Sequence, residues 1–194
     1  MRWRKHLFWA VLAPSILFIL LAPAFSLLDL DNRDLCAVKA VKSTAAHRLV
    51  IWKFATEMIM RKPVTGWGMD SSRAIPGGSE VVSIANCFDS SRGKMVDYVG
   101  ERIPLHPHNA AFQLWLELGA IGVLIAVGSI VHLLRRADRN VAAGRGDRPL
   151  TAAVFSSTFI VYNVSFGIWQ SWLIFACIVL FTLTSLSRGP THAT

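Results

Sequence analysis

Acidic residues are scarce in this 194-residue chain. Twelve Asp and Glu residues face 20 Lys and Arg residues, and only 16% of the chain is charged, whereas 53% is hydrophobic. Apolar runs long enough to cross a bilayer account for this composition, so it indicates a membrane protein. The basic excess does not indicate a nucleic-acid partner, because it is gathered beside apolar runs as the positive-inside rule requires. These basic residues, predicted to be cytoplasmic, are Arg2, Arg4, Lys5, Arg135, Arg136, Arg139, Arg145 and Arg148.

Cysteine is also rare, and the three cysteines, Cys36, Cys87 and Cys177, form no metal-ligand pattern. We expect neither a metal nor another cofactor. Cys36 and Cys87 fall in a segment predicted to be exported, where an oxidising compartment permits a disulfide. Sequence does not give the distance between them, so a bonded pair and two free thiols both remain open. Cys177 lies in an apolar run and is predicted to pack as a small hydrophobe.

Four apolar runs predict four membrane spans. The stretch 150–186 would measure about 55 Å as one helix, against a hydrocarbon core of ~30 Å, and the polar break at 163–170 divides it in two. The first run is too long for a signal peptide, and Pro14 and Pro23 fit a kinked, uncleaved span. The predicted spans are residues 7–28, 110–134, 150–166 and 169–187.

We therefore predict an all-α, polytopic transmembrane protein with a single membrane domain over residues 1–194. Residues 29–109 form a large periplasmic loop, and residues 135–149 and the tail containing Arg188 are cytoplasmic. Residues 44–60 are predicted to form a helix near the membrane surface, because apolar side chains cover more than one of its faces.

The segment 70–101 is polar and rich in Gly and Ser, with no clean period, and we expect it to be irregular. Its carboxylates show no spacing that singles out an acid/base pair. Its cations could line a path for an anionic substrate, although surface solvation explains each of them equally well. They are Arg73, Arg92 and Lys94, together with Arg102 directly after the segment.

The most informative stretch is residues 105–122, where a polar opening leads directly into an apolar run. Asn109 is predicted to be the N-cap of the helix, and Pro107 keeps the approach to it extended. His108 then lies beside a helix N-terminus, where free amides and the helix dipole favour anions and disfavour a protonated imidazole. A neutral His108 beside a bound phosphate would suit a general base, and the ordinary alternative is an interfacial histidine.

Three further side chains fit a site of this kind. Arg48 and Trp52 lie four residues apart and share one face of the predicted 44–60 helix. A planar guanidinium is well suited to binding a diphosphate, although an interfacial cation is the ordinary alternative. Glu117 lies about 12 Å below the cap, where an ionisable group is costly, and it could orient His108 or pair with Arg48.

The spacing of these residues is characteristic. His108 and Asn109 are followed by nine residues and then by Gly119-Ala120-Ile121-Gly122. This resembles the His-Asn-x9-Gly-x-x-Gly signature of the bacterial O-antigen ligases and lipid-linked polysaccharide polymerases. Upstream, Arg48, Trp52, a proline and a Gly-x-Gly turn occur in the order seen in that superfamily. We expect Gly119 and Gly122, with Ala126, to form a small-residue strip for helix packing.

The resemblance implies that His108 is the catalytic base and that Arg48 binds a lipid diphosphate. We also place Asn109, Trp52 and Glu117 at the substrate site. The implied reaction is glycosyl transfer on the periplasmic face of the inner membrane, in lipopolysaccharide or surface polysaccharide biosynthesis. The glycan leaves undecaprenyl diphosphate and joins a hydroxyl of lipid A–core in a ligase, or of another repeat unit in a polymerase.

These residues do not separate ligase from polymerase. A non-catalytic membrane scaffold or fragment is the alternative from a different class, and it would not require His108. Members of the superfamily are longer and carry further spans upstream. Three alternatives therefore remain open: the chain is a gene fragment, an inactive remnant, or a split subunit whose partner chain supplies the additional spans.

Overall fold

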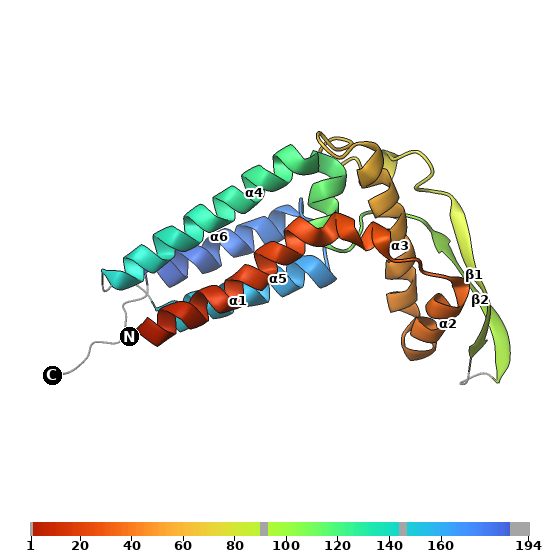
Figure 1. Cartoon of the computed structure of the whole chain (residues 1–194), viewed down its shortest axis with the longest axis horizontal. Coiled ribbons are helices and arrows are strands. Elements are labelled where there is room, and N and C mark those ends of the chain that lie inside the picture. The colour runs from red at the N-terminus through yellow and green to blue at the C-terminus, as the bar shows by residue number, and fades with distance from the viewer. Residues whose placement is uncertain (1, 90–92, 144–146, 187–194) are drawn as a thin grey trace.

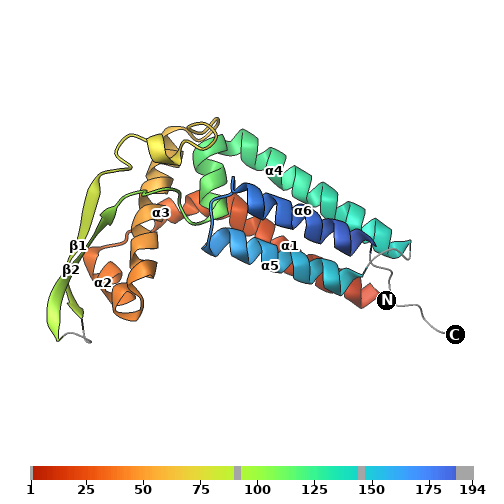
Figure 2. The same ribbon diagram turned by 180° about the vertical axis from the view of Figure 1, so that it is seen from behind.

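The computed structural model describes residues 2–89, 93–143 and 147–186, so the predicted cations Arg92, Arg145 and Arg188 lie outside the described part. The helices α1, α4, α5 and α6 lie side by side in an elongated bundle (Figure 1). At one end of the bundle α3 runs across it, and α2 and a two-stranded hairpin lie beyond α3 (Figure 2). The elements are α1 (Arg2–Leu21), η1 (Ala22–Leu27), α2 (Asn32–Val41), α3 (Ser43–Arg61), η2 (Ser72–Ala74), β1 (Val81–Asp89), β2 (Lys94–Glu101), α4 (Ala110–Ala142), α5 (Arg148–Val164) and α6 (Ser171–Leu186).

The four bundle helices coincide with the four predicted spans. Among the described helices, α4 is the one that is long and apolar enough to cross a membrane, and Leu12–Leu27 and Ser171–Thr184 are shorter apolar helices. Large apolar side chains are exposed on the bundle, among them Ile125 at 66% and Phe175 at 67%. An apolar outer surface suits contact with lipid. Insertion of all four helices remains a prediction.

The helix predicted at residues 44–60 is confirmed as α3, but its apolar side chains are mostly inside the protein. Ile51, Ala55 and Ile59 are almost fully buried in a core shared with α4 and η1. Trp52, one of the residues predicted to form the site, packs against this core. α3 is therefore a support for that site as well as a surface helix.

The expectation of an irregular 70–101 segment is wrong. β1 and β2 pair as an antiparallel hairpin, with a bulge between Ile84 and Cys87. A half-buried strand is recognised in a sequence by alternating apolar and polar residues, and the bulge interrupts that alternation. Apolar side chains such as Val81 and Val99 are also exposed, which obscures the pattern further. The fold is mostly helical, and the hairpin is a departure from the all-α prediction.

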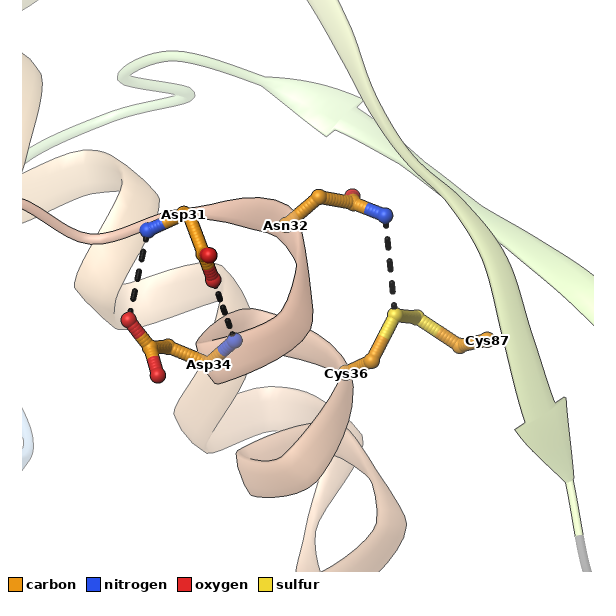
Figure 3. The surroundings of a disulfide bond; sticks show 5 residues. All are labelled: Asp31, Asn32, Asp34, Cys36 and Cys87. Atoms are coloured by element: carbon orange, nitrogen blue, oxygen red, sulfur yellow. Dashed lines mark hydrogen bonds between the residues drawn. A yellow bond between two sulfur atoms is a disulfide. The ribbon is translucent and has the colours of Figure 1, made fainter.

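Cys36 in α2 and Cys87 in β1 form a disulfide, which decides between the two states that the sequence left open (Figure 3). The two cysteines are 51 residues apart in sequence, and closing a loop of that length is worth about 4 kcal/mol in the chain-entropy description. α2 begins at a capping box in which Asp31 and Asp34 each accept the other's backbone N–H. The disulfide therefore attaches a well-capped helix to the hairpin.

α4 is broken at Gly119, whose φ of 61° and ψ of −167° are outside the helical range. The loop after α3, residues 63–68, fits into the break and satisfies the backbone groups that the break leaves unpaired. Four backbone hydrogen bonds hold it there: Trp67 N to Leu116 O (2.9 Å), Gly68 N to Glu117 O (2.9 Å), Ala120 N to Pro63 O (2.8 Å) and Ile121 N to Val64 O (3.2 Å).

Two of the motif glycines, Gly66 and Gly119, allow this close contact. A Cβ on Gly119 would lie 2.4 Å from the Val64 carbonyl oxygen, and one on Gly66 would lie 2.4 Å from the Glu117 carbonyl oxygen. The prediction that Gly119 and Gly122 receive another helix is wrong, because a loop backbone approaches Gly119. Leu118 of the same helix lies against Gly122.

Candidate active site

A hydrogen bond joins the arginine motif of α3 to the histidine motif that precedes α4. The indole N–H of Trp52 donates to the carbonyl oxygen of Pro107 at 2.9 Å. The Trp52 ring also stacks on Phe112 of α4, with ring centroids 5.4 Å apart. Arg48 lies one turn before Trp52 on the same face of α3, so this contact brings Arg48 toward the His-Pro-His segment.

His106 lies within a basic cluster. Burial of its ring, and after it the charge of nearby groups, together lower its pKa from 6.5 to about 4. Those groups are His108, Arg73 and Arg48. His106 is therefore neutral at neutral pH. The cluster draws on α3, on η2 and on the segment before α4, and it makes this end of the bundle suitable for an anion.

The backbone of His108 has a φ of 54°, which is uncommon for a residue with a side chain. Its N–H donates to Nδ1 of His106 at 3.2 Å, and the two rings lie with centroids 4.3 Å apart. Neutral His106 supplies the lone pair that this bond needs. His106 thus helps to hold His108 in place.

The ring of His108 is oriented by a carbonyl group. Its Nδ1 lies 3.2 Å from the carbonyl oxygen of Ser165, in the turn between α5 and α6. A carbonyl oxygen only accepts, so Nδ1 carries the hydrogen, and Nε2 holds the lone pair when the ring is neutral. The arrangement thus assigns Nε2 as the proton-accepting atom.

Asn109 is confirmed as the N-cap of α4. Its Oδ1 accepts from the backbone N–H of Ala111 (3.0 Å) and Phe112 (3.2 Å), and its Nδ2 donates to Asn163 O (3.2 Å). The residue is 2% exposed and both polar ends of its side chain are used. The geometry favours a positioning role over the predicted substrate contact. The same holds for Trp52, whose N–H is used by Pro107.

Glu117 is fully buried, and the structure gives its carboxylate the partners that the sequence left open. In the described residues its carboxylate is bonded to neither Arg48 nor His108, but to neutral donors. They are the backbone N–H of Asp70 (2.9 Å), the Ser72 hydroxyl, the Gln113 amide (3.0 Å) and the Trp169 indole N–H. Glu117 thus joins α4 to η2 and to the turn between α5 and α6.

The turn between α5 and α6 is the part of the site that sequence reasoning missed. It was predicted only as a boundary between two spans, yet Ser165 contacts His108 and a Cβ on Gly167 would lie 3.0 Å from the His106 ring. The available signal was a polar cluster between two apolar runs.

In the sequence, nothing distinguished Arg73 from the other cations that could line a path for an anionic substrate. The structure does so: Arg73 lies near His106, whereas Arg102 pairs with Glu80 at 3.4 Å.

Known proteins are similar to this chain across both motifs. The model of a family described as O-antigen ligase matches residues 1–127, which include both motifs. A protein of Rickettsia conorii is 31% identical over 97% of this chain, and one of Rickettsia typhi is 32% identical over 93%; both are named "putative polysaccharide ligase". The chain spans 43% and 41% of these relatives, respectively, and no solved structure matches it significantly. On the strength of the family match and of the two motifs it contains, the chain belongs to the O-antigen ligase family.

Proposed function

We propose that the chain carries the catalytic base and a diphosphate-binding arginine of a membrane glycosyltransferase that transfers a lipid-linked glycan to a sugar hydroxyl. The observation that carries this proposal is the Trp52–Pro107 hydrogen bond, which brings together the segments that carry Arg48 and His108. The names of the relatives support polysaccharide as the transferred material and favour a ligase over a polymerase. Undecaprenyl diphosphate as donor and lipid A–core as acceptor follow from the family resemblance.

In the proposed reaction, the acceptor hydroxyl oxygen forms a bond to the anomeric carbon of the glycan. The proton of that hydroxyl passes to Nε2 of His108. The bond from the anomeric carbon to the diphosphate breaks, and the diphosphate leaves with the electron pair. Arg48 and Arg73 neutralise the negative charge that develops on the leaving diphosphate. The departure of a diphosphate chiefly requires stabilisation of that charge.

We further propose that this end of the bundle faces the periplasm. The N-terminal end of α1 lies at the opposite end of the bundle from α3 and the hairpin (Figure 1). The basic residues at the start of α1 and after α4 fit a cytoplasmic side. The Cys36–Cys87 disulfide fits an oxidising compartment on the other side.

Labelling of single cysteines tests this orientation. The background is Cys177→Ser, because Cys177 is the free cysteine and the other two are bonded. With Ser79→Cys, the introduced thiol should react with a membrane-impermeant maleimide in intact cells. With Ala142→Cys, it should react only after permeabilisation. Both positions are exposed, so the reverse pattern would overturn the orientation.

Arg48→Lys tests the diphosphate site. Lysine keeps the charge but loses the forked geometry, and the loss of one charge-assisted hydrogen bond, about 1.5–3 kcal/mol, corresponds to a fall in transfer on the order of 10- to 100-fold. Transfer onto the acceptor is measured in native membranes and normalised to inserted protein. Arg61→Lys, at the exposed end of the same helix, is the matched control and should transfer like the parent. Equal activity of both variants would contradict the proposed role of Arg48.

A further inference from the structure

The turn between α5 and α6 is hydrogen-bonded along the first two turns of α4. In the last turn of α5, just before this turn, the carbonyl oxygen of Asn163 accepts from the Asn109 amide. Further along, the backbone N–H of Ile168 donates to Oε1 of Gln113 at 3.0 Å, and the indole of Trp169 donates to Glu117. Ser165 lies between these attachments, with its carbonyl oxygen on Nδ1 of His108.

Glu117 is the buried centre of these attachments. It accepts directly from Trp169, and it also accepts from the Gln113 side chain, whose oxygen holds the backbone of Ile168. On its other side it accepts from the backbone of Asp70 and from Ser72, the residue that precedes Arg73. One carboxylate thus connects the turn beside His108 with the segment that carries Arg73.

We propose that Glu117 is a positioning residue that, through Trp169 and Gln113, keeps the Ser165 carbonyl on Nδ1 of His108 and leaves Nε2 as the proton acceptor. The catalytic part of this inference rests on the proposed function. The choice of tautomer does not, because it is a property of the protein without substrate.

The physical reason is that a neutral imidazole has two tautomers, and the partner of one nitrogen decides which is populated. When the Ser165 carbonyl moves away, the proton can transfer to Nε2, and a ring in that form cannot accept a proton there. The buried carboxylate holds the turn rigidly because four donors converge on two oxygens that have no contact with water.

The test is the tautomer of His108, read by ¹⁵N nuclear magnetic resonance of histidine-labelled protein in lipid bilayers. The His108 signals are assigned as those that disappear in His108→Asn. In the parent protein the neutral ring should carry its proton on Nδ1. A parent ring protonated on Nε2 would overturn the inference by itself, before any variant at Glu117 or its partners is made.

Trp169→Phe removes the indole N–H and keeps an aromatic ring at the position. It should produce a population with the proton on Nε2 and lower kcat for transfer about three- to tenfold, with KM for the lipid-linked donor unchanged. Trp172→Phe is the matched control, because Trp172 donates to Gln170 at 2.8 Å and has no bond to Glu117. The control should keep the parental tautomer and kcat.

The outcomes separate the two claims. An unchanged tautomer in folded Trp169→Phe would overturn the positioning role of Glu117. A changed tautomer with unchanged transfer would support that role and contradict the proposed function of His108. A loss of kcat with the parental tautomer would also overturn the inference, since Trp169 would then act by another route.

Discussion

Replacement of His108 by alanine is expected to lower glycan transfer by roughly 10²- to 10⁴-fold, the range that general-base assistance supplies. Nε2 of His108 is the atom that the Ser165 hydrogen bond leaves free to accept a proton. Transfer onto the acceptor is measured in native membranes and normalised to inserted protein. Because alanine is strained at the positive φ of this residue, His108→Asn is measured beside it, since asparagine tolerates that conformation. Both variants should show this loss.

Two other histidines provide comparisons. His106→Ala should lower transfer by a factor of a few up to about tenfold, because it removes one hydrogen bond to the backbone of His108 and no reacting group. His132→Ala should have no effect, because His132 is exposed at the far end of α4. Near-parental transfer by both His108 variants would remove the catalytic assignment and leave the scaffold alternative.

Replacement of Gly119 by alanine is expected to destabilise the protein by about 3–5 kcal/mol, a large part of a typical domain stability. The backbone at Gly119 has a conformation open almost only to glycine, and a Cβ there would lie 2.4 Å from a carbonyl oxygen and 2.6 Å from the backbone nitrogen of Gly66. Both contacts are with backbone, so the 63–68 loop would have to leave the break in α4. Thermal unfolding, followed by the reactivity of the free Cys177 thiol, measures the change.

Gly128→Ala is the matched control in the same helix. A Cβ at Gly128 meets nothing within 4 Å, and its backbone is helical, so the stability should change by no more than about 1 kcal/mol. Similar unfolding temperatures for Gly119→Ala and Gly128→Ala would show that the break in α4 is not held by this contact.

The sequence by itself determined the features that depend on neighbouring residues. The apolar runs predicted the four bundle helices, and the polar break at 163–170 placed the boundary between α5 and α6, because these are local patterns of hydropathy. The cap at Asn109 and the helix containing Arg48 and Trp52 followed from short-range hydrogen bonding and helical period. The order and spacing of the residues in both motifs also indicated the O-antigen ligase family.

The tertiary structure decided what depends on partners distant in sequence. Glu117 was recognised as unusual, but its bonds come from residues 45 to 52 positions away as well as from Gln113 on its own helix. Local pattern does not contain those distances. The role of Gly119 likewise depends on a loop more than 50 residues upstream that enters the helix at this point. Most of all, the tautomer of His108 is set by the carbonyl of Ser165, a backbone group that every residue has and that only folding brings to the ring.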